Sequence, residues 1–154
     1  MISTADLFDE RGDEVASLAL QLHDLGGRVI FDGPIRTVRC HRDNALVKQI
    51  LATPGEGAVL VVDGGGSLES ALVGDLIAAS AVAHGWAGIV VHGAIRDRAV
   101  IATLPLGVKA LGSNPRRSAK SGVGEVDVPV VIAGVRFTPG HHLWADADGI
   151  LIEQ

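Results

Sequence analysis

The sequence predicts an α/β fold with a mixed central sheet, and three observations support this prediction. Two apolar runs, "AVLVVD" and "AGIVVHG", are continuous enough to form strands buried on both faces. The helical pattern "DLIAASAVAHG" separates them, and this order favours a right-handed crossover between two parallel strands. The last third of the chain instead shows short strands with Gly, Pro and Asp turns, which adds further β-structure.

Length and composition are typical of one compact domain, which we expect to span residues 1–154. The chain is 47% hydrophobic but only 3% aromatic, so its core is expected to consist of Val, Ile, Leu and Ala. A formal net charge of −5 gives no attraction to phosphate backbones, so no direct nucleic-acid partner is expected. The N-terminus lacks a secretory pattern, and no apolar run is long enough for a membrane span. We therefore expect a cytoplasmic protein.

The first elements are expected to be a short helix and a pair of strands. "TADLFDERGDEVASL" begins with a helix capped by Ser3 or Thr4, and its modest buried face contains Ala5, Leu7 and Phe8. "GGRVIFDGPIRTVRC" alternates apolar and polar residues, which is typical of strands. Its "DGP" segment is interpreted as a turn between two strands.

The next elements begin a βαβ unit. "RDNALVKQILATPGEG" predicts a helix with Asp43 or Asn44 as its cap, ending before Pro54 and Gly55. The strand "AVLVVD" follows and ends in "GGGS", a tight turn. This turn partly matches a dinucleotide-binding fingerprint, but the third glycine of that pattern falls at Glu69, so the match fails.

Several reactive side chains have plain structural interpretations. Neighbouring residues of a strand point to opposite faces, so His141 and His142 are poorly placed to chelate one ion, and a turn pair is favoured. Cys40 lies on a predicted strand without an assignable base, which favours a small core residue over a nucleophile.

Gly74 suggests where the crossover helix begins. In a helix running from residue 68 to residue 84 it would occupy the middle, at a cost of about 1 kcal/mol relative to Ala. We therefore expect the helix to start at Gly74 or Asp75, after an irregular or extended lead. That start would leave the amides of Asp75, Leu76 and Ile77 free to bind an anion.

Arg96 and Asp97 directly follow the second buried strand. In a parallel sheet, this position shares an edge with the start of the crossover helix. Arg96 suits a carboxylate because its guanidinium donates two parallel hydrogen bonds, and Asp97 suits a hard cation such as Mg²⁺ or Mn²⁺. Asp75 is placed to orient a water or transfer a proton. The alternative is a surface salt bridge beside a capped helix.

This arrangement resembles a known family. Gly74-Asp75, followed across one helix and one strand by Arg96-Asp97, is similar to the signature of metal-dependent pyruvate aldolases of the 4-hydroxy-4-methyl-2-oxoglutarate type. The segments "GGRVIFDGPIRTVRCHRDNALVK", "VLVVDGGGSLESALVGDL" and "GEVDVPVVIAGVRFTPG" resemble RraA-like proteins, named after a regulator of ribonuclease activity. The similarity covers nearly the whole chain. Members once labelled MenG-like, as menaquinone methyltransferases, share it, but the incomplete glycine fingerprint gives no support to that activity.

The resemblance implies a three-layer β/β/α swivelling-domain fold and a ring-shaped homotrimer. It further implies a class II aldolase that splits 4-hydroxy-4-methyl-2-oxoglutarate into two pyruvates and decarboxylates oxaloacetate through a pyruvate enolate. In that reading Gly74, Asp75, Leu76 and Ile77 contact a small 2-keto acid substrate. The implied site is completed by three further residues: Arg96 on the substrate carboxylate, Asp97 on a divalent metal cation, and Lys120 nearby, unless Lys120 is only a solvated loop charge.

The family also contains regulators that bind and inhibit an RNA-degrading endonuclease. Regulator-type members can lack the acidic residues of the motif, whereas this sequence has both Asp75 and Asp97. The resemblance therefore favours the enzyme and keeps a non-catalytic trimeric regulator as the alternative.

Overall fold

The structure is a computed structural model that describes residues 1–154. Its helices are α1 (Thr4–Arg11), the 3₁₀ turn η1 (Gly12–Glu14), α2 (Ala45–Leu51), α3 (Asp75–Ala83) and α4 (Arg98–Ile101). Its strands are β1 (Val15–Ser17), β2 (His23–Asp24), β3 (Phe31–Arg39), β4 (Val59–Asp63), β5 (Ala71–Val73), β6 (Gly88–Ile95), β7 (Gly107–Ser113), β8 (Glu125–Val126), β9 (Val130–Ile132), β10 (Val135–Phe137), β11 (His142–Asp146) and β12 (Gly149–Glu153). None of the helices has the length and apolar character needed to cross a bilayer.

The predicted mixed sheet is confirmed. Strands β3, β4, β6 and β7 run parallel as neighbours, with β4 and β6 in register from Val59 opposite Gly88 to Asp63 opposite His92. Helix α3 lies between β4 and β6 in the chain, so the βαβ unit expected from the sequence is present. On the other side of β3 the sheet continues antiparallel through β11, β12 and β1.

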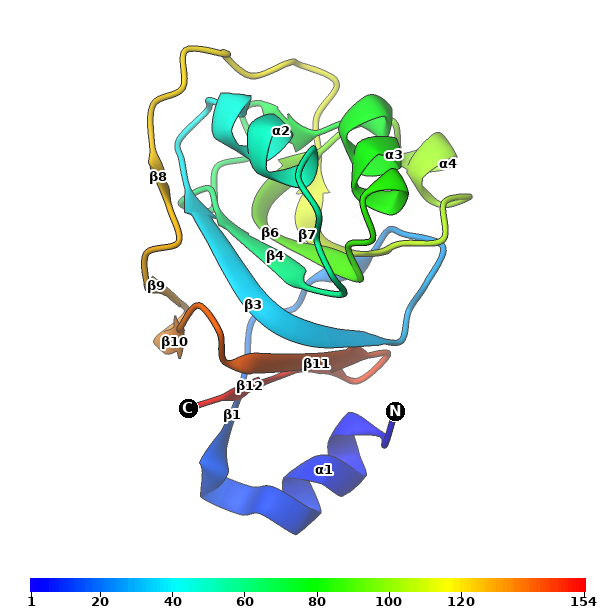
Figure 1. The fold of residues 1–154 in the computed structure, drawn as a ribbon, viewed down its shortest axis with the longest axis vertical. Helices are drawn as coiled ribbons and strands as arrows, with labels where there is room; N and C mark the ends of the chain where they lie inside the picture. Colours follow the sequence, from blue (N-terminus) through cyan, green and yellow to red (C-terminus); the bar gives the residue numbers. More distant parts are fainter.

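The two larger of three hydrophobic clusters divide the molecule into three layers. Alternate residues of β4 point to opposite faces: Leu60 and Val62 belong to the core beneath the helices, whereas Val59 and Val61 pack with Leu143 of β11. Figure 1 shows the same arrangement, with α2, α3 and α4 on one side of the parallel strands and β11 and β12 on the other. The layers are thus helices, parallel strands and antiparallel strands.

The expected "DGP" turn is wrong. Asp32, Gly33 and Pro34 lie inside β3, which continues without a break. Pro34 is tolerated because β3 pairs with β4 only from Ile35 onward, so its missing N–H precedes that ladder. A side chain on Gly33 would collide with the carbonyl of Gly57, so the glycine here permits close packing of two chain segments.

Helix α1 begins as predicted but buries a different face. The Ser3 side chain accepts a hydrogen bond from the Asp6 amide and caps the helix. Leu7 is buried, whereas Ala5 and Phe8 are exposed, contrary to expectation. The helix is attached through Leu7, which packs with Val15 and Leu151, and through its first residue. The amide and hydroxyl of Thr4 both donate to the Asp146 carboxylate, at 2.8 and 2.7 Å.

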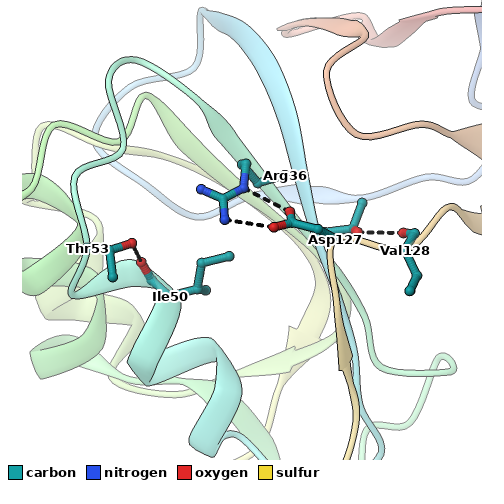
Figure 2. Close-up of polar contacts among 6 residues, drawn as sticks. Arg36, Ile50, Thr53, Asp127 and Val128 are labelled. Atoms are coloured by element: carbon teal, nitrogen blue, oxygen red, sulfur yellow. Dashed lines mark hydrogen bonds and ion pairs between the residues drawn. The ribbon is translucent and has the colours of Figure 1, made fainter.

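A bidentate ion pair joins β3 to the segment that follows β8. Figure 2 shows Arg36 donating to both carboxylate oxygens of Asp127, each at 2.8 Å. The hydrogen bonds from Arg36 lower the pKa of Asp127 against the opposing effect of burial. The same view shows the Thr53 hydroxyl donating to the carbonyl of Ile50, which satisfies the last turn of α2.

Candidate functional site

The candidate site is a cavity of about 290 Å³ on the helical side of the sheet. It is bounded by α2, the first two turns of α3, the residue after β6, and the loop that follows β7. Because the helices follow parallel strands, their N-termini meet at the carboxyl edge of the sheet. Among the residues expected from the sequence, the cavity brings together Gly74, Asp75, Leu76, Ile77, Arg96 and Lys120.

Helix α3 starts where the sequence predicted, but most of its first amides are already occupied. Gly74 is the N-cap residue and offers no side chain. The Asp75 amide donates to Asp97 Oδ2 at 3.1 Å, and the Leu76 amide donates to Asp75 Oδ1 at 2.9 Å. Only the Ile77 amide has no acceptor within the chain. The expectation of three free amides is therefore wrong, because two nearby carboxylates satisfy two of them.

Asp97 thus caps a helix that begins 22 positions earlier in the chain. A carboxylate at this place also interacts favourably with the positive end of the helix dipole. Arg96 and Asp97 form no ion pair with each other, so the simple surface salt bridge considered above is absent. The capped helix of that alternative is present, with Asp97 as the capping group.

Glycine is needed at position 74 for space and not for backbone freedom. Its φ of −118° is accessible to any residue. A Cβ built there would lie 3.1 Å from Asp97 Oδ2 and 3.4 Å from Arg96 Nε. The glycine lets the side chains of Arg96 and Asp97 approach the start of α3.

Arg96 is held by its backbone and by one side-chain contact. Its amide donates to the carbonyl of Val73 at 2.9 Å, which ties the end of β6 to the end of β5. Its Nη1 donates to the carbonyl of Pro115 at 3.4 Å. The guanidinium contacts no carboxylate, so its charge remains available to a ligand.

Asp43 fixes the loop that follows β7. Its carboxylate accepts hydrogen bonds from the amides of Ala45, Ser121 and Gly122. Burial alone would raise the pKa of Asp43, but these backbone donors lower it below its ordinary value of 3.8. The loop therefore has a fixed path, and Lys120 reaches the cavity with Nζ 3.1 Å from Asn44 Oδ1.

The cavity is strongly basic in an acidic protein. It is lined by four cationic residues, Lys48, Arg96, Arg117 and Lys120, and by one carboxylate, Asp75. No ion pair joins any of these residues to another charged group. Lys48 and Arg117 were not expected from the sequence. For Lys48 a signal existed, because it stands one helical turn after the predicted cap Asn44 and thus on the same face of α2.

The residues at Asp97 fit a hard divalent cation that keeps most of its water. Asp97 is exposed and has one oxygen, Oδ1, that accepts no hydrogen bond from the protein. It borders a second hollow, which also includes Arg96, and does not line the cavity between α2 and α3. The chain contains no group of three or more metal-binding side chains. One carboxylate supplemented by water and substrate oxygens is a normal Mg²⁺ environment, and zinc-like ligation is not supported.

The other motifs have structural roles. Gly65 and Gly66 adopt positive φ in a turn whose Gly64 and Gly66 amides both donate to the carbonyl of His92. This turn leads to β5 and not to a helix, so it cannot present a helix N-terminus to a dinucleotide. Cys40 is buried, and burial raises the pKa of its thiol to about 12, as befits a core residue.

The two adjacent histidines face different partners. Nδ1 of His141 lies 3.1 Å from the Glu153 carbonyl, whereas Nε2 of His142 lies 2.7 Å from an Asp32 carboxylate oxygen. The prediction that they do not share one ion agrees with this geometry. They occupy the antiparallel side of the molecule and take no part in the cavity.

Comparison with known proteins adds a family to this geometry. Residues 4–152 match the family model described as RraA-like, Aldolase/RraA. A solved structure named the RNA-processing inhibitor RraA from Thermus thermophilus is 47% identical, has a TM-score of 0.96, and aligns over 99% of this chain and 92% of its own. Another solved structure is named S-adenosylmethionine:2-dimethylmenaquinone methyltransferase from Geobacillus kaustophilus. It is 45% identical, has a TM-score of 0.97, and aligns over 99% of this chain and 94% of its own.

A more distant structure carries a related name. Streptomyces coelicolor RraAS2, described as an unusual member of the RNase ES inhibitor RraA protein family, is 29% identical. It has a TM-score of 0.79 and aligns over 98% of this chain and 79% of its own. The fold expected from the resemblance agrees with these structures.

Proposed function

This chain belongs to the RraA-like family, and on that premise we propose that it is a divalent-metal-dependent aldolase. The proposed reaction splits 4-hydroxy-4-methyl-2-oxoglutarate into two pyruvates, and oxaloacetate decarboxylation is a side activity. The observation that supports this most strongly is the cavity in which Arg96, Lys120 and two further cations lack carboxylate partners. Such a cavity favours a small anion, and its 290 Å³ is large enough for a short 2-keto acid.

Substrate orientation is assigned to Arg96 and the start of α3. The Arg96 guanidinium donates to the carboxylate at C1 of the substrate, and the unpaired Ile77 amide supplies a further donor at the helix N-terminus. Gly74 has no side chain and so lets Arg96 approach the start of α3. These contacts fix the scissile C3–C4 bond relative to the remaining groups.

Proton transfer is assigned to Asp75. One of its oxygens accepts from the Leu76 amide, which holds the carboxylate in place, and the other is free to hold a water. The water accepts the proton of the C4 hydroxyl while the C3–C4 bond breaks and its electron pair moves toward the 2-keto group. One pyruvate is released, and a proton returned to C3 gives the second.

Asp97 is the residue proposed to hold the cation, through Oδ1. A bound Mg²⁺ or Mn²⁺ supplies Lewis-acid stabilisation of the negative charge that develops at the 2-keto oxygen. Lys120, positioned by Asn44, adds positive charge near the same anion. The proposed assembly is a homotrimer in the cytoplasm.

The direct test measures pyruvate release from 4-hydroxy-4-methyl-2-oxoglutarate and from oxaloacetate. We expect turnover with Mg²⁺ or Mn²⁺, loss of turnover with EDTA, and loss in Asp97→Asn, a variant that retains a capping oxygen for α3. Turnover that persists in EDTA, or an Asp97→Asn variant as active as the wild type, contradicts the mechanism. A Schiff base on Lys120 would instead predict inactivation by borohydride with substrate in the wild type and protection in Lys120→Gln.

A regulator of RNA processing is the second candidate function. It is favoured by 47% identity to a protein named an RNA-processing inhibitor and by the acidic charge of the chain. The proposed partner is an RNA-degrading endonuclease with a basic segment. Co-purification with such a segment at low salt, together with inhibition of RNA cleavage and no pyruvate release, would support this function over the aldolase.

A further inference from the structure

We infer that Lys48 forms a second anion subsite that selects 2-keto acids bearing another carboxylate at C5. The inference rests on the proposed function for the position of the C1 carboxylate at Arg96. It assigns a role to a residue that lies on a different helix from the aldolase motif. The substrate class it specifies is a five-carbon dicarboxylate backbone, in contrast to a monoacid of the same length.

The position of Lys48 follows from the course of the groove. Asn44, at the start of α2, donates through Nδ2 to the carbonyl of Leu72 at 3.2 Å and so lies beside the strand that leads into α3. Lys48 stands one turn further along α2, about 5.4 Å from that point. Ser80 occupies a similar position on α3, because it follows Ile77, in the first turn of that helix, by about one turn. Lys48 and Ser80 line the same cavity from its two helices.

The two ends of the cavity therefore carry separate positive charges. Arg96 lies beside Gly74 at the N-terminal end of α3, whereas Lys48 lines the cavity from α2, one turn after the start of that helix. A substrate whose C1 carboxylate binds Arg96, and whose carbon chain extends into the groove, directs its other end toward Lys48. The Ser80 hydroxyl adds a polar group on the opposite wall.

The charged group of Lys48 has no partner within the protein. Its ammonium group forms no hydrogen bond or ion pair within the chain, and its side chain is exposed. Lys120, in contrast, is already held by Asn44 Oδ1. Lys48 and Arg117 are thus the cations in the groove whose donors are all free for a ligand carboxylate, and of the two only Lys48 lies on α2, across the cavity from Ser80 of α3.

Equilibrium binding of two matched ligands tests this subsite without turnover. 2-Oxoglutarate and 2-oxopentanoate share the 2-keto acid and the chain length, but only the first has a carboxylate at C5, and neither can undergo the retro-aldol step. Isothermal titration should show wild-type protein binding 2-oxoglutarate about three- to fivefold more tightly, the upper part of the range for one exposed ion pair. In Lys48→Gln the two dissociation constants should agree within about twofold, and Lys48→Arg should restore the preference.

A matched control separates local contact from overall charge. Arg136 on β10 is exposed, forms no ion pair, and lies on the opposite side of the molecule from α2 and α3 (Figure 1). Arg136→Gln removes the same charge as Lys48→Gln and should leave the preference unchanged. A preference lost equally in both variants, or lost only in Lys120→Gln, overturns the assignment to Lys48.

The outcome is separable from that of the proposed reaction. Wild-type protein that prefers 2-oxoglutarate through Lys48 but releases no pyruvate would refute the aldolase and leave the subsite standing. Equal affinity of the wild-type protein for the two ligands would refute the subsite whatever the turnover. Unchanged thermal unfolding of Lys48→Gln verifies that the variant is folded.

Discussion

Replacement of Asp97 separates its structural role from its proposed chemical role. Asp97 Oδ2 accepts the Asp75 amide at 3.1 Å and caps α3, while Oδ1 is free. Asp97 also adopts a left-handed conformation, with φ of 60° and ψ of 42°. Asparagine retains a capping oxygen and tolerates the left-handed conformation. Alanine lacks the oxygen and does not tolerate the conformation, whereas glycine lacks the oxygen but tolerates the conformation.

The expected losses of stability follow from these two contributions. Loss of a helix cap costs about 1 kcal/mol, and a left-handed alanine costs up to about 1 kcal/mol more than aspartate. Asp97→Ala should therefore lower the free energy of unfolding by about 2 kcal/mol, equivalent to a fall in Tm of about 4–8 °C for a chain of this size. Asp97→Gly should lose about half as much, and Asp97→Asn should remain within about 0.5 kcal/mol of the wild type.

Thermal unfolding followed by far-UV circular dichroism measures this order. All variants are compared at one protein concentration without added metal, because an oligomer or a bound ion would shift Tm by mass action. Equal Tm values for Asp97→Asn and Asp97→Ala would refute the capping role. If Asp97→Asn is as stable as the wild type yet inactive, the loss of activity belongs to the charge and not to the helix.

Three further predictions concern neighbouring features. Gly74→Ala should reduce kcat/KM for pyruvate release about tenfold by displacing Asp97 and Arg96. Its Tm should fall by no more than about 2–4 °C, the cost of losing the Asp97 cap, because the φ of residue 74 itself suits alanine. Unchanged kcat/KM would contradict the spatial role of this glycine. Asp43 has a depressed pKa, so the stability it adds is present above its ordinary value of 3.8 and lost as the pH falls through the lower folded value. In urea unfolding, the difference in free energy of unfolding between wild type and Asp43→Asn should be largest at neutral pH and should shrink in acid. A difference that does not change with pH would argue against this linkage. The Cys40 thiol of the folded protein, with a pKa of about 12, should resist alkylation by iodoacetamide near neutral pH and should react once the protein is unfolded in urea. Mass spectrometry measures both reactions. Fast alkylation of the folded protein would contradict the burial of this thiol.

The sequence predicts the parallel part of the fold well because its signals there are local. A continuous apolar run, a glycine turn and a helix pattern suffice for β4, α3 and β6, and the mid-helix cost of Gly74 places the start of α3 correctly. The "DGP" segment misleads because turn residues also occur inside a strand: Asp32, Gly33 and Pro34 pair with β11, and the pairing with β4 begins only after the proline.

Most parts of the site that were missed depend on contacts between residues distant in the sequence; the Leu76 amide is the exception, because it donates to the adjacent Asp75 carboxylate. The amides of Asp75 and Leu76 are free only if no carboxylate reaches them, and the position of Asp97 Oδ2 is set by the path of β6 and the turn after it. The inclusion of Lys48 and Arg117 depends on the width of the groove between α2, α3 and the loop, which no sequence period specifies.

The two candidate functions would use surfaces of opposite charge. Four cations and one carboxylate give the cavity a formal charge of +3, so the rest of a chain whose net charge is −5 carries −8. A small carboxylate is attracted to the cavity, whereas an arginine-rich segment is repelled by it and attracted to the remaining surface. Arg96→Ala should therefore abolish binding of 2-oxoglutarate, measured by titration, and leave salt-sensitive capture by an arginine-rich endonuclease segment intact or slightly stronger. If Arg96→Ala weakens that capture, the partner uses the cavity itself, and catalysis and regulation would compete for one site.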